Sequence, residues 1–295
     1  MSPTLKAALW MLGAIVSFSS MAVAGREVST TLDTFEIMMY RSAIGVIIVA
    51  AVLTARGRWH VVRRDHLRHH VLRNIAHFTG QNLWFFAVTA APLAQVFALE
   101  FTTPIWVVLL APLLLREPIT RVKALAVVLG FSGILIVARP GAETVNAGTI
   151  TAASAAVFFA LTYIATKRLT RTETIGGIMF WLTALQLVFG LIAAGYDGDI
   201  AWPDGAALPF VVVIAIGGLV AHFCITNALS VASASVVAPL DFVRLPAIAV
   251  VGMALYAEPL DVWVFVGAAV IFAANYINIL SENRKDRVAG ASRAG

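Results

Sequence analysis

Charge is what this sequence has least of. Only 13% of its 295 residues are Asp, Glu, Lys or Arg, against a share of about 25% in soluble domains. Hydrophobic residues make up 60%, and the mean hydropathy is +0.88. Such a chain cannot cover its whole surface with groups that bind water. The composition therefore excludes a soluble globular protein and predicts a membrane protein.

Cysteine and several catalytic motifs are also scarce or missing. The one cysteine, Cys224, lies in an apolar segment, so no disulfide can form within the chain. The sequence has no HExxH, GxSxG, GxxxxGKS or GxGxxG. Neither an intramembrane protease nor an ATP-driven pump is therefore indicated, and we expect neither a cofactor nor a metal site.

Ten apolar segments are long enough to cross a bilayer, for which about 17–25 residues are needed. Their apolar runs are continuous and not alternating, which favours helices over a barrel. The expected fold class is an all-α membrane protein with ten transmembrane helices. The segments are 5–24, 35–53, 71–89, 93–115, 122–138, 148–166, 175–194, 208–229, 233–257 and 262–280.

The distribution of Lys and Arg predicts the orientation. With the N-terminus placed in the cytoplasm, 17 of the 21 lie on the cytoplasmic side, two on the opposite side and two, Arg41 and Arg244, within spans. This is a strong positive-inside bias. Both termini are predicted to be cytoplasmic, with 282–295 as a cytoplasmic tail. The bias also explains the net charge of +5 without a nucleic-acid partner.

The sequence repeats itself at an offset of 141 residues. "IMMYRSAI" (37–44) falls on "IMFWLTAL" (178–185), "LEFTT" (99–103) falls on "LDFVR" (240–244), and one Glu-Pro pair falls on another. The chain therefore reads as two five-span units, 1–141 and 142–281. Because five is odd, the second unit must enter the membrane from the opposite side. Such inverted repeats are common in secondary transporters and suit alternating access.

The two Glu-Pro pairs mark corresponding joints in the two units. They are Glu117-Pro118 and Glu258-Pro259. A residue before proline avoids the helical region, while proline suits the first position of the next helix, where a carboxylate is also favoured. We interpret both pairs as structural joints between the fourth and fifth span of each unit.

These features together resemble the EamA-type branch of the drug/metabolite transporter superfamily. The resemblance rests on the ten spans, the duplication, the Glu-Pro joints, the Tyr40-Arg41 pair and the spacing of Gly130 and Gly133. It implies an exporter of amino acids, of the aromatic amino-acid type, or of other small metabolites in a bacterial inner membrane. It also implies a central cavity lined by the first, third, fourth, sixth, eighth and ninth spans. Leu182 replaces the arginine in the second half, so a role of Arg41 would not be duplicated.

Charged residues within spans are the first candidates for a site, since each costs about 2.5–3.5 kcal/mol at mid-membrane. Glu100 and Asp241 are repeat-equivalent, and Arg244 follows Asp241 by three residues. Pro104 cannot donate to the carbonyl of Glu100, which loosens the helix there. These residues either face a cavity, or Asp241 and Arg244 only neutralise each other on one helix face.

The third span places His77, Gln81 and Trp84 on one helix face, and His222 is the repeat equivalent of Gln81. They either line the cavity or serve as polar contacts between helices. Aromatic residues expected near the cavity include Phe101 and Tyr163, with Trp10, Trp106 and Phe159.

The sequence thus predicts a monomeric secondary transporter in the lipid bilayer that exports amino acids, aromatic or of a broad range, or similar small molecules. It is not expected to be an enzyme. One alternative is a membrane-embedded enzyme such as a lipid-modifying transferase, for which only the loop histidines His66, His69 and His70 offer a polar cluster. The other alternative is a sensor that transports nothing.

The orientation can be tested by cysteine labelling in intact cells, on a Cys224→Ser background. We expect Arg56→Cys to be shielded from an impermeant thiol reagent, because residue 56 lies on the predicted cytoplasmic side. Asp199→Cys is expected to react. The reverse pattern would overturn the assignment of both termini to the cytoplasm.

Overall fold

The computed structural model describes residues 2–115, 120–138, 146–196, 198–241 and 244–258, with short helical pieces between 262 and 280. Within these ranges the structure is helical and has no strand. Six helical segments of the described residues, among them Leu93–Leu110, are long and apolar enough to cross a membrane, as a multi-pass membrane protein requires. The count of ten spans and the position of the termini stay predictions. Glu117, Pro118, Pro259 and the tail 282–295 lie outside the described residues.

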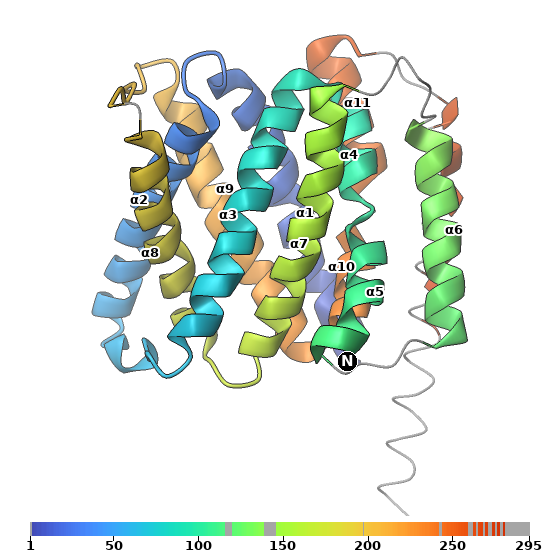
Figure 1. Cartoon of the computed structure of the whole chain (residues 1–295), viewed down its shortest axis with the longest axis horizontal. Coiled ribbons are helices and arrows are strands. Elements are labelled where there is room, and N and C mark those ends of the chain that lie inside the picture. The colour runs from blue at the N-terminus through green and yellow to red at the C-terminus, as the bar shows by residue number, and fades with distance from the viewer. Residues whose placement is uncertain are drawn as a thin grey trace, which may run out of the picture.

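The helices stand side by side in one bundle (Figure 1). The fourth and ninth predicted spans are each divided into two helices. In chain order the elements are α1 (Pro3–Val28), α2 (Thr34–Ala55), the 3-10 turn η1 (Trp59–Val61), α3 (Leu67–Ala90), α4 (Leu93–Glu100), α5 (Thr103–Leu115), α6 (Arg121–Ala138), α7 (Ala147–Leu169), α8 (Ile175–Ala194), α9 (Leu208–Val231), α10 (Ala234–Leu240) and α11 (Arg244–Tyr256).

Local sequence explains where several helices begin. Asp33 precedes α2 and accepts a hydrogen bond from the Glu36 amide at 2.8 Å, while the Glu36 carboxylate accepts one from the Asp33 amide at 2.9 Å. Asn146 and Thr149 make the same reciprocal pair at the start of α7. Each capping box satisfies backbone donors that the first helical turn leaves free.

The two halves interlock in a two-fold pattern. The 141-residue offset relates α1 to α7, α2 to α8 and α3 to α9. Helix α1 packs on α9, and α3 packs on α7. These two contacts are equivalent, because each joins the first helix of one half to the third helix of the other. Helix α2 packs on its own equivalent, α8. The equivalent helices α1 and α7 run in opposite directions (Figure 1). This arrangement agrees with the inverted repeat that the odd number of spans predicts.

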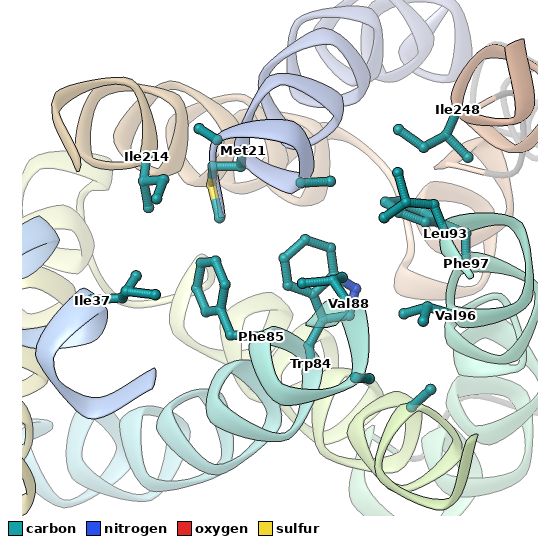
Figure 2. Packing of buried hydrophobic residues seen from close by; sticks show 14 of the residues in the cluster. Met21, Ile37, Trp84, Phe85, Val88, Leu93, Val96, Phe97, Ile214 and Ile248 are labelled. Atoms are coloured by element: carbon teal, nitrogen blue, oxygen red, sulfur yellow. The ribbon is translucent and has the colours of Figure 1, made fainter. Parts of the chain in front are cut away.

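Apolar side chains from both halves fill the space between the helices. Figure 2 shows Met21, from α1, and Phe85, from α3, pointing toward each other, with Ile37 of α2 and Ile214 of α9 beside them. Gly25 gives the Phe85 ring room, because a Cβ there would lie 2.6 Å from Phe85 Cε1. Packing of this kind joins helices where lipid removes the hydrophobic drive for association.

At equivalent positions in the two halves, a basic side chain binds main-chain carbonyls near the end of another helix. Arg26 donates to the carbonyl oxygens of Val88 at 3.1 Å and Ala91 at 3.1 Å. Its repeat equivalent, Lys167, donates to the carbonyl oxygens of the equivalent residues, Leu229 at 2.7 Å and Ala232 at 2.6 Å. We call these two contacts the corner clasps. Each satisfies carbonyls that the end of a helix leaves without a partner.

Glu258, the acidic member of the second Glu-Pro joint, belongs to the first clasp. Its carboxylate pairs with Arg26 at 2.7 Å and accepts from the Leu93 amide at 3.3 Å. The Arg26 guanidinium also lies 4.6 Å from the centroid of the Tyr256 ring. This joint therefore ties the end of α11 to the opposite half, in line with its predicted structural role.

A close approach of the two halves gives a stability prediction. A Cβ on Gly190 of α8 would lie 2.8 Å from Met39 Cα of α2, so Gly190→Ala must push two backbones apart. We expect a loss of about 1–3 kcal/mol in the free energy of unfolding. Gly130→Ala is the matched helical control, because nothing lies within 4 Å of its Cβ position. Equal thermal unfolding of both variants in detergent would contradict this account.

Candidate functional site

The candidate site lies where the two divided spans are interrupted. Helix α4 ends at Glu100 and α5 begins at Thr103; α10 ends at Leu240 and α11 begins at Arg244. Pro104 leaves the Glu100 carbonyl without its helical donor, as the sequence predicts. The hydroxyl of Thr103 takes over and donates to that carbonyl at 2.6 Å. An irregular backbone at membrane depth is tolerated where protein buries it in this way.

An ion cluster joins the two interruptions. The guanidinium of Arg244 donates to the carboxylate of Glu100 and, at 2.9 Å, to Asp241 Oδ2. Trp84 Nε1 donates to the second oxygen of Glu100 at 2.6 Å. The pair of Asp241 and Arg244 does form, but it is not self-contained, because Glu100 from the other half shares the same cation.

Aromatic rings surround this cation. The Arg244 guanidinium carbon lies 4.7 Å from the centroid of the Phe97 ring, 5.1 Å from that of Phe18 and 5.5 Å from that of Phe101. Arg244 is 1% exposed, and rings at these distances stabilise a desolvated cation. Arg244 Nε and Asp241 Oδ1 are buried without a hydrogen-bond partner in the described part of the chain.

A cavity of about 50 Å³ adjoins the cluster. One water needs roughly 10–15 Å³ on this measure, so the space holds a few waters. The walls come from the first, third, fourth, sixth, eighth and ninth predicted spans, the set that the family resemblance implies. The lining residues are Phe18, Met21, Arg73, His77, Gln81, Trp84, Glu100, Phe101, Thr103, Pro104, Phe159, Thr162, Tyr163, Thr166, His222, Ile225, Asp241 and Arg244.

One face of α3 supplies a polar stripe to the cavity. His77, Gln81 and Trp84 lie on it at helical spacing, as the sequence predicts. The rings of His77 and His222 meet edge to face with their centroids 4.4 Å apart. Both nitrogens of His77 are buried, and the described residues offer them no hydrogen-bond partner.

Arg73 extends this stripe, and its placement corrects the sequence interpretation. By sequence it counts among the 17 basic residues of the cytoplasmic side, at the start of the segment 71–89, yet it is only 2% exposed and lines the cavity. Its Nε donates to Thr166 Oγ1 of α7 at 3.1 Å. The spacing held the necessary information, because Arg73 precedes His77 by one helical repeat of four residues. Without Arg73, the Lys and Arg on the predicted cytoplasmic side still outnumber those on the opposite side.

The buried Arg41 does not reach Glu100. Its guanidinium donates to Gln81 Oε1, behind the polar stripe, and lies 3.7 Å from Met38 Sδ. The cation that pairs with Glu100 is Arg244. Gln81 thus connects a second buried guanidinium to the cavity wall.

Some of the remaining aromatic candidates line the cavity and others do not. Phe101, Phe159 and Tyr163 line the cavity, whereas Trp10 and Trp106 are each 37% exposed and do not. Helix side chains with this exposure face the lipid, as expected of aromatic residues in a membrane protein.

The three histidines expected in a loop lie instead at the start of α3, where His66 precedes the helix and His69 and His70 belong to it. The rings of His66 and His69 lie 5.9 Å apart, while His70 is buried against Trp181 at 6.0 Å. The three imidazoles therefore do not face one shared space.

The comparison with protein families decides the class. The family model described as the EamA-like transporter family matches residues 5–139 and again residues 146–280. The chain belongs to the EamA-like transporter family. The two matches begin 141 residues apart, at the offset found in the sequence, and the chain therefore contains two copies of this unit.

Curated relatives transport several kinds of small molecule. An S-adenosylmethionine uptake transporter of Rickettsia felis is 26% identical over 278 residues, 93% of this chain and 92% of that protein. A riboflavin transporter of Brucella anthropi is 27% identical, and the match covers 95% of this chain and 100% of that protein. A pseudopaline exporter of Pseudomonas aeruginosa is 24% identical, over 88% and 90%. These relatives support a transporter of small metabolites, without specific support for amino-acid export.

A solved crystal structure has the same fold. It matches with a TM-score of 0.75 at 18% sequence identity, over 94% of this chain and 98% of that chain. The likeness extends over both halves.

The ion cluster gives a second stability prediction. Arg244→Gln leaves two buried carboxylates without their cation, and we expect it to lower the free energy of unfolding by about 3–5 kcal/mol. Adding Glu100→Gln and Asp241→Asn should restore most of this loss, since no unpaired charge is then buried. The control is Arg63→Gln, because Arg63 and Asp65 form an exposed pair that contributes little.

Unfolding in detergent–denaturant mixtures measures these differences. A stable Arg244→Gln protein, or a triple variant no more stable than the single one, would show that Arg244 does not neutralise the two carboxylates.

Proposed function

We propose that this protein is a secondary transporter that moves a small amphoteric organic molecule through the cavity beside Arg244. The proposed solutes carry an amino-acid-type group together with a planar or aromatic part. Export of aromatic or other amino acids, as the sequence predicts, falls in this class. So does transport of a larger molecule with an amino-acid end.

The observation that carries this proposal is the shared ion cluster at two interrupted helices. Glu100 comes from one half, Asp241 and Arg244 come from the other, and all three line the cavity. Binding of a cationic group at Glu100 or Asp241 would compete with Arg244 for the same carboxylates. A solute can therefore change the contact between the halves directly, which is what coupling of binding to movement requires.

The lining of the cavity supports a solute with both flat and charged parts. Phe101, Phe159 and Tyr163 offer aromatic surface, and Glu100 and Asp241 offer acceptors for an ammonium group. The curated relatives point the same way, since S-adenosylmethionine and riboflavin both combine a fused aromatic ring system with polar groups.

Alternating access is the proposed mechanism. Sites for drug-sized ligands measure about 300–1,000 Å³, whereas this cavity measures about 50 Å³, so the walls must separate to admit a solute. In our proposal the units 1–141 and 142–281 move against each other, and the corner clasps open in turn. We further propose a monomer in the bacterial inner membrane, with both termini in the cytoplasm.

The alternative functions differ in what they require. A lipid-modifying transferase would lose activity when the loop histidines are replaced by alanine, whereas flux through the central cavity would continue. A sensor would bind a solute and show no flux. The family assignment favours transport over both.

Flux into proteoliposomes tests the proposal. We expect labelled L-phenylalanine or S-adenosylmethionine, which carry an amino-acid group, to cross faster than in empty vesicles, with and without a pH gradient. Riboflavin, which lacks that group, is measured for comparison. Absence of flux for both amino-acid compounds would count against this solute class. Flux that continues after His66, His69 and His70 are replaced by alanine would exclude the enzyme alternative.

The role of Glu100 is tested in the same vesicles. Glu100→Gln keeps the shape of the side chain and removes its charge, so we expect at least a tenfold loss of flux, equivalent to about 1.4 kcal/mol. The control, Asp65→Asn, removes an exposed loop carboxylate and should leave flux unchanged. If Glu100→Gln inserts normally and transports at the wild-type rate across roughly pH 5.5–8, Glu100 is only structural.

A further inference from the structure

Arg73 is the one charged cavity residue that the ion cluster of Arg244 leaves unexplained. It is almost fully buried, and its hydrogen-bond partners among the described residues are two neutral oxygens, Thr166 Oγ1 at 3.1 Å and Asn74 Oδ1 at 3.4 Å. In the part of the chain that the structure describes, it has no carboxylate within ion-pair distance. A guanidinium has five N–H donors arranged to match a carboxylate or phosphate.

The described residues around Arg73 contribute positive charge and no negative charge. The second buried guanidinium, Arg41, also has only neutral partners among the described residues, Gln81 and Met38. On α3, His77 stands between Arg73 and Gln81, the residue that Arg41 contacts, and the ring of His77 meets that of His222. A buried cation costs about 2.5–3.5 kcal/mol on insertion scales, so two without an anion form an arrangement that a negative group would stabilise.

The opposite end of the cavity has the opposite sign. There, Glu100 and Asp241 share the single cation Arg244, which leaves one net negative charge. Arg73 and Trp84, the residue that contacts Glu100, are eleven residues apart on α3, or about 16 Å along its axis. The cavity therefore has a positive end at Arg73 and a negative end at the ion cluster.

We infer that Arg73 forms the anion subsite for the transported solute and receives its carboxylate or phosphate group. In this arrangement Thr166 orients the guanidinium by accepting from Nε, and Asn74 accepts one bond from Nη1. The remaining terminal N–H groups are left for the solute. The ammonium group of the solute faces Glu100 and Asp241, and its planar part lies along Tyr163 and Phe159. Arg244 is less suited to the anion, because two carboxylates already occupy it. The inference rests on the proposed transport of an amphoteric solute.

Anion binding to the purified full-length chain tests the subsite without a known substrate. Potassium acetate and inorganic phosphate are titrated in detergent while thermal unfolding is followed. At about ten times the dissociation constant, we expect the wild-type Tm to rise by about 3 °C. Arg73→Gln should show no rise. Arg68→Gln removes an exposed arginine of the same helix and should respond like the wild type, which accounts for general effects of salt.

A second variant guards against misfolding of Arg73→Gln. Thr166→Val removes the hydrogen bond that orients the guanidinium while keeping the size of the side chain. We expect it to need several times more acetate for the same rise in Tm. A purely structural contact between α3 and α7 would lower the Tm of both variants and leave their response to acetate unchanged, and that result would overturn the inference.

Flux measurements test whether Arg73 binds the carboxylate of the solute or a resident inorganic anion. In proteoliposomes, acetate should inhibit entry of L-phenylalanine or S-adenosylmethionine, which have a carboxylate, and should spare riboflavin, which has none. Acetate that stabilises the protein but does not compete with any transported carboxylate would refute the assignment to the solute. Failure of both amino-acid compounds to cross would count against the proposed function, and the Tm titration would still decide whether Arg73 binds anions.

Discussion

The structure depends on one guanidinium that neutralises two carboxylates inside the membrane. Arg244 bonds Glu100 from the first half and Asp241 from the second. Neither acid could remain ionised in a low-dielectric interior without a partner, and the cation alone would be equally costly. The halves are thus joined within the helical bundle by a contact that cannot be lost without replacement. Any motion that separates Glu100 from Arg244 must supply another charge or admit water.

This constraint explains the local structure around it. Interruptions of α4/α5 and α10/α11 bring the three side chains to one level, and Thr103 satisfies the carbonyl that Pro104 leaves free. Aromatic rings around the guanidinium exclude water and stabilise the cation by their π faces. Phe18 and Phe101, two of these rings, also line the cavity, so the architecture and the candidate site share the same residues.

Much of this arrangement could be predicted from the sequence. Continuous apolar runs locate the helices, and the 141-residue offset identifies the duplication that the family matches confirm. Acidic residues at equivalent positions point to the ion cluster, because charges within a span are rare and costly. The polar face of α3 follows from helical spacing. Such features are local or repetitive, and they need no knowledge of which helices touch.

What the sequence does not reveal depends on contacts between distant segments. Arg73 lies close to the end of a predicted span, where a basic residue normally anchors the helix at the cytoplasmic surface. Its burial becomes visible only through Thr166, 93 residues away. The partner of Arg41 was hidden for the same reason. It is not an acid but Gln81, which lies 40 residues along the chain and accepts the hydrogen bond.

The corner clasps bear on how the two halves could diverge after duplication. Arg26 and Lys167 differ, and so do Val88 and Leu229, yet both clasps have the same geometry because the acceptors are main-chain carbonyls. Every residue type provides such an oxygen, so substitution at the acceptor positions leaves the contact intact. Only a long cationic side chain must be retained. A duplicated gene could thus lose most of its internal similarity and still encode the same corner at both faces of the membrane.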